Sequence, residues 1–186
     1  MFAIGDAAWT AFFVSVPVLV VTRFGANPRV AGLLVAALGT GAVLGNVVSY
    51  RVLLERVEGL RVIAACVLGQ ALPLWFLTVH MHWLGYCVAL AVSGIANGLI
   101  NPSIHALITL RIPPALRPTA MTTMMIVFAV VQPIAALAAG SVLGRFGPEP
   151  VLVGFAAVQT VSMLAIAVSS LAHAGAHGSS AEVGAA

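Results

Sequence analysis

The chain has 186 residues, of which 61% are hydrophobic and only 7% are charged, whereas roughly 25% of the residues in a soluble domain are charged. This composition, with a mean hydropathy of +1.11, excludes a water-soluble fold. The net charge is +3, but the eight basic residues are all arginines in short turns without interleaved aromatics, so nucleic acid is not an expected partner.

Six apolar segments follow one another along the chain, and each is close to the length of about 20 residues that crosses a bilayer. Short polar or Pro/Gly turns separate them. The predicted spans cover about residues 2–22, 30–54, 60–79, 83–110, 116–143 and 151–171. We therefore predict an all-α membrane protein with one six-helix transmembrane domain over residues 1–172. Residues 173–186 are small and polar, so we expect a flexible cytoplasmic tail there.

The first segment places Asp6, Trp9, Thr10 and Phe13 on one helical face, and Asp6 is the only acidic residue within any predicted span. A carboxylate at membrane depth is costly unless it faces a partner or a wet cavity, where it can carry a proton or attract a cation. Near the start of a helix it can instead lie among headgroups, favoured by the helix dipole. Both interpretations stay open, and Asp6 and Thr10 are candidates for the substrate path.

The second segment carries a small residue at every fourth position, at Ala37, Gly41, Gly45 and Ser49. Helices in lipid associate through close backbone approach, which such rows of small residues allow. We therefore predict a tightly packed span in which Gly41 and Gly45 lie at a helix–helix contact. A charged turn follows the span.

A polar stripe runs along the fourth segment. Its members are four residues apart and so share one helix face: Ser93, Asn97, Asn101 and His105. One interpretation is a helix that lines a water-filled substrate path. The other is hydrogen bonding between helices, worth about 0.6 kcal/mol on average in membranes. Gly94 and Gly98 form a GxxxG pair beside the stripe, which predicts helix packing, and Pro102 should kink the helix.

Neither the cysteines nor the histidines form a recognisable metal motif. Cys66 and Cys87 lie inside apolar runs, where we expect ordinary packing. His80 and His82 have no third ligand nearby in the sequence, which favours a hydrated turn over a metal site. We predict no metal, no cofactor and no catalytic residue.

Arginines in short loops indicate the orientation in the membrane. Five lie in the turns after the second and fourth segments: Arg51, Arg56, Arg61, Arg111 and Arg117. Three lie in the remaining turns: Arg23, Arg29 and Arg145. The difference predicts a multi-pass protein of the cell (inner) membrane with both termini in the cytoplasm.

Three stretches resemble the C-terminal six-helix half of a major facilitator superfamily transporter. Glu55-Arg56 and Gly59-x-Arg61 are similar to the charged turn after the second helix of each half, with one extra residue between them. GLINPSIHALITLRIPPALRPTAM (98–121) is similar to the tenth helix and its loop, and QPIAALAAGSVLGRFGP (132–148) to the eleventh helix and its outer turn. The likeness spans about residues 2–171.

The resemblance implies a secondary transporter in which the first and fourth helices of each half line a central cavity. It also implies a cytoplasmic gating turn at Glu55, Arg56 and Arg61. We therefore expect alternating-access transport of a small molecule, by efflux and with proton coupling. Because the family pairs two six-helix halves, the expected partners are the lipid bilayer, the substrate and a second half or a copy of this chain. A start directly on an apolar span suggests a truncated or split product.

Two other functions are alternatives. A homo-oligomeric channel needs a polar ring, for which Asn97 and Asn101 are candidates. A rhomboid-like intramembrane protease would use Ser93 with His173, because their neighbouring residues faintly resemble the serine and histidine motifs of that class. A nucleophile and its base must meet within about 3 Å. With a rise of about 1.5 Å per residue, Ser93 lies roughly 15 Å and His173 more than about 30 Å from the outer face, which argues against a protease.

Overall fold

The structure is a computed structural model, and it describes residues 2–53, 66 and 68–183. Every regular element within these residues is a helix, which confirms the predicted all-α class. The long helices are α1 (Phe2–Arg23), α2 (Pro28–Val48), α5 (Trp83–Arg111), α6 (Arg117–Phe146) and α7 (Pro148–Val183). In the described part of the chain, these five are long and apolar enough to span a membrane.

Three short helices complete the described structure. A π-helical turn, η1 (Ser49–Leu53), continues α2, and the two 3₁₀-helices are η2 (Leu72–Thr78) and η3 (Pro114–Leu116). The third predicted span, 60–79, falls partly outside the described residues. Its described end becomes a 3₁₀-helix around Pro73, because proline lacks the N–H that would continue the α-helical hydrogen bonds.

Local sequence signals set the helix boundaries. The Asn27 side chain caps α2 by accepting a hydrogen bond from the Arg29 N–H at 3.0 Å, and Pro28 occupies the first turn, as expected at a helix start. Gly147 ends α6 with a φ of 78°, a conformation that glycine adopts readily. These signals explain where α2 begins and where α6 ends.

The last helix differs from its prediction. We expected a span over about 151–171 and a flexible tail after residue 172, but α7 is helical from Pro148 to Val183. No proline interrupts residues 173–183, and their alanines are strong helix formers, so the helix continues past the apolar segment. The boundary of the transmembrane domain at residue 172 stays a prediction.

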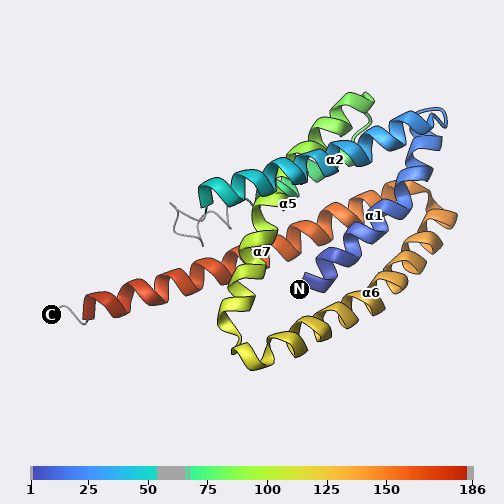
Figure 1. The fold of residues 1–186 in the computed structure, drawn as a ribbon. Helices are drawn as coiled ribbons and strands as arrows, with labels where there is room; N and C mark the ends of the chain where they lie inside the picture. Colours follow the sequence, from blue (N-terminus) through green and yellow to red (C-terminus); the bar gives the residue numbers. More distant parts are fainter. Residues whose placement is uncertain (1, 54–65, 67, 184–186) are drawn as a thin grey trace.

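The helices pack in two groups that lie side by side. In one group α2 packs along α5, and in the other α1 packs on α6 and α7 (Figure 1). The short helix η2 contacts both α5 and α7 and so joins the groups. Apolar side chains that include Phe12, Leu34, Tyr86 and Leu152 form the buried core between them. This arrangement places α1 opposite the α2–α5 pair.

Four glycines bring α2 and α5 into backbone contact, as predicted from their spacing. A Cβ atom at Gly41 or Gly45 would overlap the carbonyl oxygen of Ala91 or Ile95 on α5. A Cβ atom at Gly94 or Gly98 would overlap the carbonyl oxygen of Leu38 or Ala42 on α2. The Ser49 hydroxyl, next in the same row, donates to the Leu99 carbonyl at 3.3 Å. Small residues therefore fix how closely these two helices approach.

A buried arginine joins the elements at one end of the bundle. The Arg23 side chain, 5% exposed, donates to the Glu149 carboxylate at 2.9 Å and to the Leu77 carbonyl at 3.0 Å. It also donates to the Tyr86 hydroxyl, which in turn donates to the Val79 carbonyl at 2.7 Å. The end of α1 is thus held to η2, α5 and α7 through one guanidinium group.

The close glycine contact predicts that one added methyl group at the crossing lowers the stability of the protein. Gly98→Ala should lower stability by about 1–3 kcal/mol, the usual range for overpacking, because the new Cβ atom meets backbone that cannot rotate away. Gly140→Ala on α6 is the matched control, since nothing lies within 4 Å of its Cβ position. Thermal unfolding in detergent micelles measures both. Equal melting temperatures for the two variants would contradict the contact.

The hydrogen bonds of Arg23 predict that substitutions at Arg23 and at Glu149 lower the stability of the protein by different amounts. Arg23→Ala leaves the Leu77 carbonyl without its donor and should cost about 1–3 kcal/mol. Glu149→Gln keeps a side-chain oxygen that can accept from Arg23, at a site where the glutamate is 57% exposed, so its effect should stay below about 1 kcal/mol. Melting temperatures in the same detergent compare them. A larger loss for Glu149→Gln would contradict the network.

Candidate cavity between α1 and the α2–α5 pair

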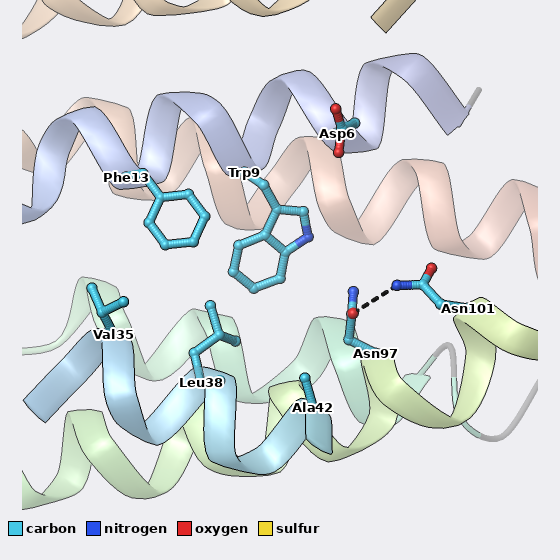
Figure 2. Close-up of a pocket in the computed structure, with 9 residues that line it drawn as sticks. Asp6, Trp9, Phe13, Val35, Leu38, Ala42, Asn97 and Asn101 are labelled. Atoms are coloured by element: carbon cyan, nitrogen blue, oxygen red, sulfur yellow. Dashed lines mark hydrogen bonds between the residues drawn. The ribbon is translucent and has the colours of Figure 1, made fainter. Parts of the chain in front are cut away.

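A cavity of about 340 Å³ lies between α1 and the α2–α5 pair, a volume within the range of about 300–1,000 Å³ that is typical of ligand pockets. Side chains from the two sides point toward one another across it (Figure 2). The cavity is lined by Asp6, Trp9, Phe13, Val35, Leu38, Gly39, Ala42, Asn97 and Asn101. Most of these residues are apolar, so the polar groups are few and localised.

Asp6 is the one charged residue among those that line the cavity. Its carboxylate accepts a hydrogen bond from the Gln132 side-chain amide of α6 at 2.8 Å. The amide is neutral, so it orients the carboxylate without cancelling its charge. The Asp6 side chain is therefore held at the cavity by a neutral partner, and its role there stays a prediction.

Trp9 contributes an aromatic wall that its neighbours hold in place. Its ring packs edge-on against Phe155 of α7, with centroids 5.0 Å apart, and against Phe12 at 5.8 Å. The Phe12 and Phe155 rings stack on each other at 5.0 Å. In Figure 2 the indole of Trp9 and the ring of Phe13 both extend from α1 toward α2. This aromatic cluster pre-organises the apolar part of the cavity.

The residues of the predicted polar stripe on α5 lie in two different environments in the structure. Asn97 and Asn101 line the cavity, where the Asn101 amide donates to the Asn97 side-chain oxygen at 2.9 Å. Ser93 is fully buried elsewhere and donates to the Gln70 carbonyl at 2.9 Å. Its hydroxyl therefore joins α5 to the segment just before η2 and does not line the cavity. The His105 backbone continues α5, and its role in a substrate path stays a prediction.

Thr10 is not among the residues that line the cavity. The Thr10 hydroxyl donates to the Asp6 backbone carbonyl at 3.4 Å, so it contacts its own helix near the site without lining it. The gating-turn residues Glu55, Arg56 and Arg61 lie outside the residues that the structure describes. Their role stays a prediction.

The histidines and cysteines have other surroundings. His80 Nε2 lies 3.5 Å from the Glu149 carboxylate, and His82 Nδ1 accepts from the Leu84 N–H at the start of α5. Cys66 and Cys87 are free thiols. Within residues 2–53, 66 and 68–183, no group of three or more His, Cys, Asp or Glu side chains is placed to hold a metal ion.

Long apolar helices around a cavity with one carboxylate and two amides define a multi-pass membrane protein. The family model of the Major Facilitator Superfamily matches residues 1–184. The chain belongs to this superfamily, whose members are membrane transporters and not enzymes. Its 186 residues are consistent with one six-helix half of the family fold. No curated protein and no solved structure is significantly similar to the chain.

The different surroundings of Ser93 and Asn97 can be tested by thiol labelling. In a background with Cys66→Ser and Cys87→Ser, a cysteine replacing Asn97 should react with a small, charged methanethiosulfonate, because the cavity admits water. A cysteine replacing Ser93, one helical turn away and fully buried, should react at least about tenfold more slowly, since only thiolates in contact with water react. Equal rates would show that α5 is rotated relative to this structure.

Proposed function

We propose that the chain is half of a secondary active transporter that moves a small molecule through the cavity between α1 and the α2–α5 pair. The observation that carries this proposal is the convergence of Asp6, Asn97 and Asn101 on one cavity in a chain of the Major Facilitator Superfamily. Amides and a carboxylate are costly in lipid unless they face a partner or a wet path. A substrate path accounts for their common position.

A second half would complete the transporter. The described helices line the cavity from two sides, with α1 on one side and α2 and α5 on the other. Large apolar side chains are exposed on α6, including Ile134 and Leu137, and on α2, including Val43. These faces can contact lipid or a partner helix. We propose that a second six-helix half, or a copy of this chain, packs against these faces and that substrate is held between the two halves.

Alternating access would then come from rocking of the two halves around the cavity. The proposed location is the cell (inner) membrane with both termini cytoplasmic, as the arginine distribution favours. The turn at Glu55, Arg56 and Arg61 would form and break ion pairs between the access states. The proposed direction is efflux.

Asp6 is the proposed coupling residue. The side chains that face it from the packed elements are neutral: Gln132 on α6, and Asn97 and Asn101 across the cavity. On α7, Gln159 is also neutral, and its amide donates to the neighbouring Gly5 carbonyl at 3.1 Å. Proton binding at Asp6 would therefore change the charge of the cavity from −1 to zero and bias which access state is favoured.

The test uses the cysteine at position 97 in proteoliposomes. The external pH is held constant, so that thiol reactivity is constant, and only the internal pH is varied. For a proton-coupled carrier, the internal pH should change the rate of labelling from outside at least about twofold, because it shifts the populations of the access states. Adding Asp6→Asn should abolish this response.

A channel would behave differently in the same preparation. A carrier passes no sustained ion current without turnover of its substrate, whereas a channel built around Asn97 and Asn101 conducts in the absence of substrate. Steady conductance in planar bilayers that is lost on replacing both asparagines by alanine would overturn the transporter proposal. A labelling response unchanged by Asp6→Asn would overturn the coupling role.

A further inference from the structure

We propose that the cavity binds lipophilic organic monocations, with Asp6 as their counter-ion and Trp9 as the aromatic surface beside the cationic centre. This inference rests on the proposed transport function and extends it by naming the substrate class. It follows from the charge, the wall chemistry and the number of oxygen atoms at this one site.

Charge is the first argument. The carboxylate of Asp6 faces the cavity, and the residues that line the cavity with it include no basic side chain. Within the described part of the chain, its polar partner is the neutral amide of Gln132, and it forms no ion pair. An uncompensated carboxylate attracts a cation and repels an anion. Anionic substrates are therefore disfavoured.

The walls supply the second argument. Trp9 and Phe13 on one side and Val35 and Leu38 on the other present mainly aromatic and aliphatic surface. An indole face attracts a cation, by about 0.5–2 kcal/mol depending on desolvation. Because Phe12 and Phe155 already hold the ring of Trp9, little side-chain entropy is lost on binding. Such walls favour a cation that carries its own apolar groups.

The number of oxygen ligands argues against an inorganic ion. A calcium ion takes about six to eight oxygen ligands, but this cavity offers one carboxylate and two amides. The Asn97 side-chain oxygen already accepts a hydrogen bond from Asn101, which leaves fewer oxygen atoms free to bind a metal ion. A bulky organic cation needs no such shell, because its charge is spread and weakly hydrated. One carboxylate also matches one positive charge, so a dication would bring an uncompensated charge into the site.

Two probes of the same size and shape but opposite charge test the inference. Tetraphenylphosphonium and tetraphenylborate differ chiefly in the sign of their charge. Binding to the purified full-length chain is measured by equilibrium dialysis in neutral detergent at constant pH, with protein-free micelles as the blank. The phosphonium should bind at least about tenfold more tightly than the borate, a difference of about 1.4 kcal/mol.

Variants locate the effect at the carboxylate. Asp6→Asn should weaken phosphonium binding at least about tenfold, whereas Glu149→Gln, the same change of charge at the other end of the bundle, should leave it unchanged. Trp9→Leu should weaken it about fivefold, as expected for loss of a cation–π contact. Asn97→Lys keeps Asp6 and adds a positive charge that cancels the charge of the cavity, so it should remove the preference for phosphonium even if Asp6→Asn fails to fold.

The outcomes separate this inference from the transport proposal. Equal binding of the two probes, or unchanged phosphonium affinity in both Asp6→Asn and Asn97→Lys, overturns the monocation site. The labelling response to internal pH uses neither probe, so transport would still stand in that case. Conversely, selective phosphonium binding without a labelling response supports the site and overturns the proton coupling.

Discussion

The close crossing of α2 and α5 is the constraint on which the cavity depends. Leu38 and Ala42 lie on α2 directly opposite Gly94 and Gly98, and both also line the cavity. Because the glycines let the two backbones touch, α2 and α5 act as one wall. The neighbouring Asn97 then projects beyond this wall toward α1. A residue larger than glycine at the crossing would push α2 and α5 apart and would displace the Asn97 amide.

The opposite wall depends on contacts that involve α1, α6 and α7. Gln132 from α6 orients the Asp6 carboxylate, and Phe155 from α7 fixes the ring of Trp9. The Arg23 network holds the far end of α1. The carboxylate and the aromatic surface are thus positioned by separate helices, so that charge and apolar surface face the same cavity without being adjacent in sequence.

The sequence predicted those features that repeat at helical spacing. The row at Gly41 and Gly45 has a four-residue period, and it identifies a packing face without knowledge of the partner helix. The faces of α1 and α5 with Asp6, Asn97 and Asn101 were also predicted, because polar groups in apolar runs are conspicuous. The predicted spans were drawn from apolar runs between polar or Pro/Gly turns, and Asn27 and Gly147 lie at helix ends in such turns.

Features that depend on long-range contacts could not be predicted in the same way. Ser93 shares the period of Asn97 but faces a different helix, because the stripe drifts around α5 and only the neighbours decide what each residue meets. The role of Gln132 depends on a residue 126 positions away. The buried position of Arg23 was also missed, since an arginine after an apolar run normally indicates a loop.

The central claim is that α1 and the α2–α5 pair enclose a water-filled cavity, with lipid on the outer face of α6. Spin labels at position 97 and at Ile134, an exposed position on α6, test it in lipid bilayers through collision rates with a water-soluble nickel chelate and with oxygen. The account predicts that the nickel chelate relaxes the label at position 97 and that oxygen relaxes the label at position 134. A label at position 97 relaxed mainly by oxygen would contradict it.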